Sequence, residues 1–495
     1  MNILIKQGTW STIWVYLGIA LGYVNNVLLF PQALGVELYG LTRIFISAGS
    51  IFYPFALLGV GNMLLRYFPS AKSTKEREQI LLQALFLIIL GVFGVTFFLW
   101  IARDFVYQHF AGSSALFVKN YNLFWVFNAL LVQLSFLTAY LRVNLQVVFP
   151  TFLREFALRV FQTVLAVALL KQWISPNIFM CAFVGSYALQ LLVLFWFSRH
   201  FFKDFKNFIT QHKRQEIFAR DRLYFGFFTF LTGISSALIS NIDTLMIASM
   251  IKSESTNNAG LSAVALYALC SYITTLIVIP YRSLLDVGAP VLSVAMAEKD
   301  MGTLQRIYKE SSLLQTLICG FIFLVLFLNI DLIFQICHIQ NEHAKWIFIF
   351  LGLTRLFDCI TGFNSALITL SGFYKYDLVL MLLTALLTYL SNLFFIPHWG
   401  VAGAAAASAG TLFLMNTGKL FLVQTKLKMQ PFTMYSFYAL LLLGICGFLF
   451  YLAPDLDNIW LNASYKTMGI GVVYFFMAYQ FGLLKTLLVW IRKRV

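Results

Sequence analysis

Runs of about 20 apolar residues recur along the chain between Trp10 and Trp490, which is the length an α-helix needs to cross a bilayer. The 495 residues are 60% hydrophobic and 11% charged, whereas soluble globular domains are about 25% charged. We therefore predict an all-α polytopic membrane protein.

About fourteen transmembrane helices fit this pattern. The candidate spans are 10–30, 44–65, 80–102, 120–141, 152–170, 178–197, 223–251, 260–284, 307–330, 344–370, 378–396, 401–423, 434–453 and 466–490. No connection between them is long enough for a separate soluble domain. We predict an N-terminal lobe over 1–197, a basic cytoplasmic linker over 198–222, a C-terminal lobe over 223–423 and two further helices over 434–490.

The formal net charge is +15, and most basic residues fall in alternate connections between the spans. Cytoplasmic loops of membrane proteins carry such an excess, so both termini are expected in the cytoplasm and no nucleic acid is expected as a partner. Lys419 is assigned to the inner side, and Arg43 and Lys252 are among the few basic residues on the outer side. Three arginines fall within spans, namely Arg159, Arg282 and Arg355.

The two halves of the chain also show similar patterns. Asn25 and Asn26 lie in the outer half of the first span, and Asn241 and Asp243 lie in the matching part of the seventh. Charged inner stretches follow both the second and the eighth span. Six spans separate the two starts, so the repeat is parallel. Repeated halves are typical of transporters, whose cargo site lies at the interface of the halves.

Four stretches of the sequence are informative in their order and spacing: "LGVELYGLTRIFISAGSIFYPFALLGVGNMLLRYFP", "LYALCSYITTLIVIPYRSLLDVGAPVLSVAMAEKD", "GFNSALITLSGFYKYD" and "IPHWGVAGAAAASAG". Their order and spacing resemble the bacterial polysaccharide flippases of the multidrug/oligosaccharidyl-lipid/polysaccharide exporter superfamily, over essentially the whole chain.

This resemblance implies two six-helix lobes around a central cavity, with the last two spans packed alongside. It also implies an undecaprenyl-diphosphate-linked glycan as cargo, turned from the cytoplasmic to the periplasmic leaflet of the bacterial inner membrane by alternating access. Membrane lipids are implied as partners, and polysaccharide assembly enzymes are compatible with this role.

Arg355 and Asp358 lie inside the tenth span, where burying a charge is costly. They are i and i+3 on one helix, so their side chains can pair. One interpretation is a self-neutralised pair that packs the lobe. The other is that Arg355 faces the cavity and binds a diphosphate while Asp358 positions it, because the planar guanidinium matches phosphate oxygens.

The other cations within or beside the spans have two interpretations each. Arg159 follows Glu155 by one turn and either binds cargo or extends to the headgroups. Arg282 has the same two interpretations; it follows Pro280, which should break the eighth span, and broken helices line transporter cavities. Arg43 is either an interface anchor or a gate at a cavity mouth.

The polar residues of the first and seventh spans are further cavity candidates. Asp243 is an ion or proton site, a contact to sugar hydroxyls, or a buried carboxyl bonded to Asn241 or to a neighbouring helix. Asn25 and Asn26 can bind a glycan, although hydrogen bonding between helices is the commoner use of asparagine in membranes.

Several signals are absent from the sequence. It has no G-x-x-x-x-G-K-[ST] loop and no HExxH motif, and its six cysteines form no CxxC pair. We therefore expect no metal, no cofactor and no enzymatic activity. A lipid-linked oligosaccharide flippase is the first hypothesis, with the coupling ion, proton or sodium, left open.

Two other functions compete with this hypothesis. A cation-coupled multidrug antiporter needs carboxylates in its cavity to bind the cationic drug and the coupling ion. Asp243 and Asp358 could serve, but the first span contains no carboxylate. A membrane glycan polymerase or ligase is the third hypothesis. Such enzymes usually carry a large outer loop for catalysis, whereas the outer loops of this chain are short.

Overall fold

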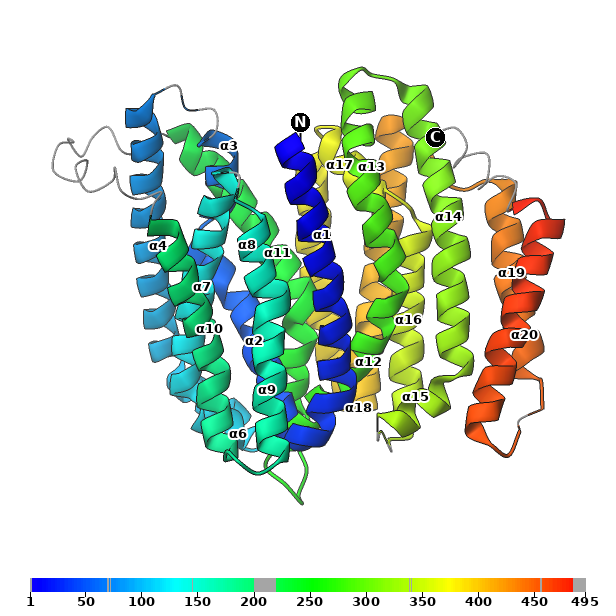
Figure 1. Cartoon of the computed structure of the whole chain (residues 1–495), viewed down its shortest axis with the longest axis horizontal. Coiled ribbons are helices and arrows are strands. Elements are labelled where there is room, and N and C mark those ends of the chain that lie inside the picture. The colour runs from blue at the N-terminus through cyan, green and yellow to red at the C-terminus, as the bar shows by residue number, and fades with distance from the viewer. Residues whose placement is uncertain are drawn as a thin grey trace. The chain divides into compact units, whose positions relative to one another are not determined.

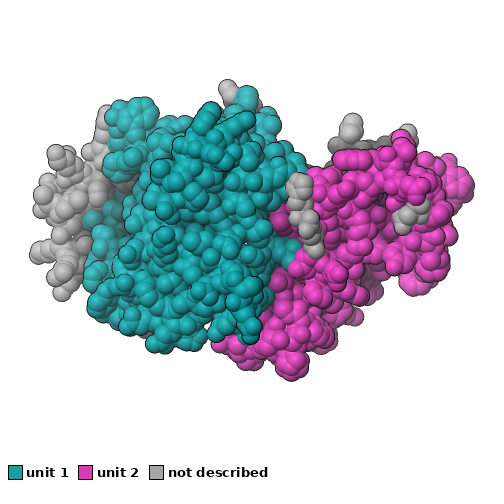
Figure 2. Space-filling view, turned by 90° about the horizontal axis from the view of Figure 1, so that it is seen from below, with its two compact units in different colours: residues 1–268 teal, residues 269–495 magenta. Residues whose placement is uncertain are grey.

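The computed structural model describes residues 2–68, 71, 73–144, 146–199, 220–337, 339, 341–454 and 456–483. Every regular element in these ranges is a helix (Figure 1), which confirms the all-α prediction. The chain divides into two compact units, residues 1–268 and residues 269–495 (Figure 2).

Unit 1 consists mainly of long helices that lie side by side (Figure 1). Its elements are α1 (Asn2–Tyr23), η1 (Val24–Leu29), α2 (Phe30–Leu57), α3 (Val60–Tyr67), α4 (Thr74–Ile101), α5 (Arg103–Phe110), α6 (Ala115–Lys119), α7 (Tyr121–Val143), α8 (Val148–Thr151), η2 (Phe152–Ala157), α9 (Leu158–Leu170), α10 (Pro176–Ser198), α11 (Arg220–Met250) and α12 (Ala259–Thr275), which continues into unit 2. The segments η1 and η2 are π-helical, a form that occurs as single turns and is frequent at functional sites.

A reversal at Gly35 separates the first two spans. Gly35 has a φ of 69°, in the left-handed region that glycine adopts freely. Arg43 Nη2 nevertheless donates a hydrogen bond to Asn26 Oδ1. In a straight helix, two residues 17 positions apart would have their backbones about 26 Å apart. The chain after Gly35 therefore returns alongside the first span.

The core of unit 1 is built around α2, which packs against α4, α7, α9 and α11. Phe45 on α2 is completely buried. Its ring lies within 6.1 Å, between centroids, of the rings of Phe117, Phe124 and Phe127. Aromatic side chains bury large apolar areas, so this cluster fixes α2 against α6 and α7.

Unit 2 continues the helical pattern. Its elements are η5 (Leu276–Val278), α13 (Ile279–Ala297), α14 (Met301–Leu328), α15 (Ile330–Ile336), α16 (Ala344–Ile360), α17 (Asn364–Leu370), α18 (Tyr374–Leu427), α19 (Met434–Tyr451) and α20 (Ile459–Gln480). An apolar core that includes Leu317, Leu443 and Tyr474 joins α14 to α19 and α20.

The long helix α18 folds back on itself at Gly400, whose φ is 56°. Thr388 Oγ1 donates to Thr411 Oγ1 at 3.0 Å. A straight helix would separate residues 23 positions apart by about 35 Å. The two halves of α18 contain the residues of the predicted spans 378–396 and 401–423.

Two other irregularities occur in the helices of unit 2. A single 3₁₀ turn, η5, lies between α12 and α13, which has Pro280 in its first turn; the helical run Ala259–Leu285 is nevertheless one continuous candidate span, so the predicted break at Pro280 stays a prediction. The helices α16 and α17 meet at a bend of 51°. Gly362 lies in this bend and has a φ of 67°.

Among the described residues, nine helices are long and apolar enough to cross a membrane, or ten if the bent pair α16–α17 is one span. The prediction of a multi-pass membrane protein is therefore confirmed. The helical segments Trp10–Leu57 and Lys375–Leu427 are each counted once, although they contain the reversals at Gly35 and Gly400. The number fourteen stays a prediction.

The boundary between the units lies within α12, because α11 packs along α2 in unit 1. The predicted linker, 198–222, falls mostly outside the described residues. The predicted lobes over 1–197 and 223–423, and the separate pair over 434–490, stay a prediction.

Candidate functional site

The charged pair predicted in the fifth span is present. Arg159 Nη2 on α9 donates to Glu155 Oε2 on η2 at 3.0 Å, and the two side chains are 28% and 17% exposed. Arg154 also donates to this carboxylate, at 2.8 Å, from a side chain that is 50% exposed. Nη1 of Arg159 is buried and has no hydrogen-bond partner among the residues that the structure describes. This part of the guanidinium therefore lacks an acceptor in the described structure.

Two glycines of α1 make room for this pair. A Cβ on Gly18 would lie 2.4 Å from the backbone oxygen of Glu155. A Cβ on Gly22 would lie 3.0 Å from the guanidinium carbon of Arg159. Small residues allow helices in membranes to approach closely, and here they place the ion pair directly against the first span.

Asn25 and Asn26 both lie on η1 and are 1% and 8% exposed. Asn25 Nδ2 donates to Arg159 O at 3.0 Å, and the Thr163 hydroxyl donates to Asn25 Oδ1 at 2.8 Å. Asn26 Nδ2 donates to Gly22 O at 2.6 Å. These amides therefore connect the end of the first span to α9 and to α1 itself.

Arg43 is buried, with 7% of its surface exposed. It donates to Asn26 Oδ1, and its guanidinium carbon lies 5.0 Å from the centroid of the Tyr39 ring, a cation–π arrangement. An anchor in the headgroup region keeps its charged end in water. The burial of Arg43 disfavours an interface anchor, and both interpretations of this residue stay predictions.

Asp243 on α11 is 4% exposed and accepts a hydrogen bond of 2.6 Å from the Tyr267 hydroxyl on α12. Asn241 Nδ2 donates to Ala237 O of its own helix at 3.0 Å. Asp243 is thus a buried carboxyl bonded to a neighbouring helix, one of the interpretations that the sequence left open.

The arginines of unit 2 have fewer contacts. Arg355 and Asp358 lie on α16 and are half-buried. In the described part of the chain, neither side chain takes part in a hydrogen bond or ion pair, so the i,i+3 pair is not formed. Arg282 on α13 is exposed.

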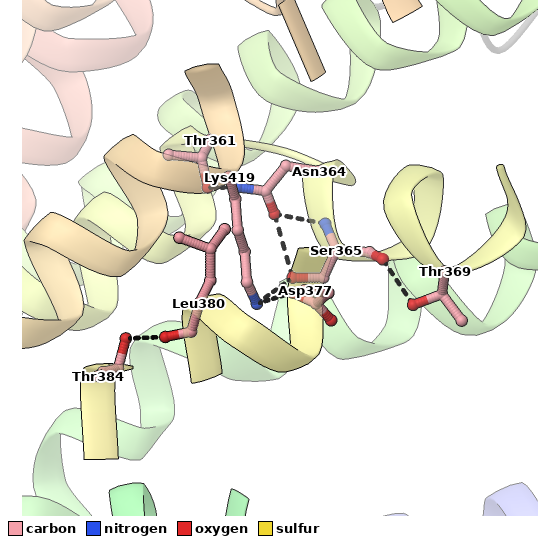
Figure 3. A network of polar contacts seen from close by, with 8 residues as sticks. All are labelled: Thr361, Asn364, Ser365, Thr369, Asp377, Leu380, Thr384 and Lys419. Carbon is pink, nitrogen blue, oxygen red and sulfur yellow. Dashed lines mark hydrogen bonds and ion pairs between the residues drawn. The ribbon is translucent and has the colours of Figure 1, made fainter. Parts of the chain in front are cut away.

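Unit 2 contains a buried charged cluster that the sequence analysis missed (Figure 3). Lys419 and Asp377 have side chains that are 8% and 15% exposed, with Nζ and Oδ1 3.5 Å apart. Lys419 Nζ also donates to Ser365 Oγ at 3.0 Å. Asn364 is 1% exposed, and its Oδ1 accepts from Ser365 N at 2.6 Å. The cluster thus joins α17 to both halves of α18.

The sequence assigned Lys419 to the inner loops, whereas the structure buries its side chain. A signal for this pairing was present. Lys419 lies near the end of one span and Asp377 just before the start of the preceding one. Adjacent antiparallel spans bring such positions to the same end of a hairpin.

The chemistry of these sites favours anions over metal ions. The described residues contain no group of three or more His, Cys, Asp or Glu side chains that could hold a metal ion. Arginines within the helices provide cationic donors instead, namely Arg159 in unit 1 and Arg282 and Arg355 in unit 2. Arginine within a membrane protein marks a functional position by default, and its planar fork suits phosphate.

Residues 4–296 match a family model described as polysaccharide biosynthesis protein, which is more than half of the chain. No relative is found among curated proteins.

Solved structures show what this fold resembles. A lipid II flippase, MurJ, in an inward closed conformation superposes with a TM-score of 0.71 at 15% identity, covering 95% of this chain and 98% of that one. An inward-facing multidrug resistance transporter of the MATE family gives a TM-score of 0.57 at 14% identity, covering 86% and 98%. An outward-facing form gives 0.54 at 14% identity, covering 86% and 95%. The chain therefore shares the fold of these solved structures.

Proposed function

Because the chain belongs to the family of polysaccharide biosynthesis proteins, we propose that it flips a lipid-linked oligosaccharide across a bacterial inner membrane. The cargo is an undecaprenyl-diphosphate-linked glycan, and it moves from the cytoplasmic to the periplasmic leaflet by alternating access. The chain is a multi-pass membrane transporter and not an enzyme. The observation that carries the proposal is the buried, unpartnered Nη1 of Arg159, because an anionic headgroup supplies the missing acceptor.

The proposed architecture has fourteen spans in two six-helix lobes around a central cavity, followed by two more helices. Each reversal, at Gly35 and at Gly400, starts a new span. The bent pair α16–α17, the continuous helical run α8–η2–α9 and α20 each cross once. This proposed assignment amounts to fourteen spans.

Arginines that lie within spans are the residues we propose for contacts to the diphosphate, Arg159 in unit 1 and, considered separately, Arg282 and Arg355 in unit 2. The negative charge of the diphosphate is spread over its four non-bridging oxygens, which accept hydrogen bonds from several N–H donors. Arginine offers five such donors in a fixed geometry. The polar residues of the first and seventh spans support this arrangement by hydrogen bonds between helices. Membrane lipids surround the spans, and polysaccharide assembly enzymes supply and consume the cargo.

The proposal is tested by measuring lipid-linked glycan on each leaflet in cells with and without the gene. Deletion should cause accumulation on the cytoplasmic leaflet and less polysaccharide at the cell surface. Arg159→Ala should fail to restore either, with at least a tenfold loss of transport. Arg159→Lys should restore part of the transport, because lysine keeps the positive charge but lacks the planar guanidinium with its paired N–H donors.

Arg154→Ala is the matched control, because Arg154 bonds the same carboxylate from an exposed position. It should restore transport to within twofold of the parent. Unchanged glycan on both leaflets, with greater sensitivity to cationic dyes, would instead favour drug efflux, the function named for the MATE transporters of similar fold.

A further inference from the structure

Three connections at one end of unit 1 are joined by hydrogen bonds. The first is the part of α2 just after Gly35, and the second is residues 111–116, which include the start of α6. The third is the 251–258 connection between α11 and α12. In the predicted topology all three lie on the outer side of the membrane.

Asn258 is bonded to both of the other connections. Its Nδ2 donates to Glu37 Oε2 at 2.9 Å, and its Oδ1 accepts from Leu116 N at 3.0 Å. Beside it, Ala115 N donates to Asn257 O at 3.0 Å. A single amide side chain therefore holds together segments that are far apart in the sequence.

The serines before α6 extend this contact. Ser113 and Ser114 are completely buried. Ser114 Oγ donates to Ala248 O at 2.7 Å, and Gly260 N donates to Ser113 O at 2.8 Å. A Cβ on Gly260 would lie 2.3 Å from Ala248 O, so the chains meet here at backbone distance.

These bonds differ from the contacts at the other end of α11. There, Phe225 packs against Tyr67 and Phe230 against Phe55, with ring centroids 5.8 and 5.9 Å apart. Hydrogen bonds can be exchanged for bonds to water at a small net cost. The hydrogen-bonded end is therefore suited to a contact that is made and broken repeatedly.

We propose that Glu37, residues 113–116, Asn257, Asn258 and Gly260 form an outer latch, with Asn258 as its central residue. Glu37 and residues 113–116 belong to the predicted first lobe, and Asn257, Asn258 and Gly260 to the predicted second. The latch keeps the outer end closed and opens when cargo leaves toward the periplasm. This inference rests on the proposed alternating access.

The first test is amide hydrogen exchange of the full-length protein in lipid nanodiscs. Asn258→Ala should speed exchange at least tenfold in peptides covering 113–117 and 257–262, because the amide of Leu116 loses its acceptor. Asn257→Ala is the matched control and should change nothing, because only the backbone oxygen of Asn257 takes part. Equal exchange in Asn258→Ala and the parent would overturn the latch.

The second test locks the latch covalently. Glu37→Cys and Asn258→Cys are combined with Cys181→Ser, because Cys181 is exposed while the other five cysteines are buried. The probe is a dye-labelled polyprenyl diphosphate carrying a short oligosaccharide, flipped in proteoliposomes. Oxidation should reduce flipping at least tenfold, and a reducing agent should restore it.

The two proposals fail in different ways. Equal flipping by the oxidised and reduced double-cysteine protein, with the disulfide verified by mass, would overturn the latch but not the flippase. Absence of flipping by the parent would overturn the flippase, and the exchange experiment alone would then decide whether the latch exists.

Discussion

Lys419 and Asp377 form a mostly buried ion pair in unit 2, with 3.5 Å between Nζ and Oδ1. Removing one member of a buried pair costs about 3–5 kcal/mol because the other charge stays buried, whereas replacing both is often neutral. We expect Lys419→Met to lower the thermal unfolding midpoint by several degrees. Adding Asp377→Asn should restore most of the loss. Fluorescence-monitored unfolding of the purified protein in detergent measures both.

Lys426→Met on the same helix is the control, because Lys426 is exposed and loses only a contact of 5.2 Å to the Tyr376 ring, so it should lower the midpoint much less than Lys419→Met does. A double variant no more stable than Lys419→Met would contradict this account.

The ion pairs also show how far the sequence alone predicts contacts between single residues. The spacing of Glu155 and Arg159 predicted their pair directly, since both lie on one continuous helix. The partner of Lys419 depends on how α18 folds back, which local spacing does not encode.

Glycines of α1 control how closely that helix approaches η2. A Cβ at Gly18 would lie 2.4 Å from the backbone oxygen of Glu155, which is too close unless the helices separate. Gly18→Ala should therefore lower the unfolding midpoint and reduce transport, because the ion pair of Glu155 and Arg159 moves with η2. The measurements are thermal unfolding and leaflet-resolved glycan transport.

Gly185→Ala on α10 is the matched control, because nothing lies within 4 Å of the Cβ it would add. Alanine is the better helix former by about 1 kcal/mol, so this variant should be as stable as the parent or slightly more stable. A Gly18→Ala variant that behaves like Gly185→Ala would show that α1 can shift without cost. The π-helical turns at η1 and η2, which bring these groups together, had no signal in the apolar pattern.

The architecture of the whole chain was largely predictable, because a bilayer fixes the length of a span. The predicted spans 378–396 and 401–423 correspond in their residues to the two halves of α18 on either side of Gly400. The grouping of helices was harder to foresee. The seventh span begins the second predicted lobe, yet α11 packs along α2 in unit 1, because packing depends on side-chain shape rather than on the order of a repeat.

The orientation of the chain is the prediction on which the latch depends. Positive charge in alternate loops places the 251–258 connection outside and the segment between α13 and α14 inside. In a Cys181→Ser background, Ser253→Cys should react with a membrane-impermeant maleimide in intact cells. Glu298→Cys should react only after permeabilisation. Both positions are exposed, so a difference in labelling reports the side of the membrane and not burial. The reverse pattern would place both termini outside, and the hydrogen bonds around Asn258 would then close the cytoplasmic end instead.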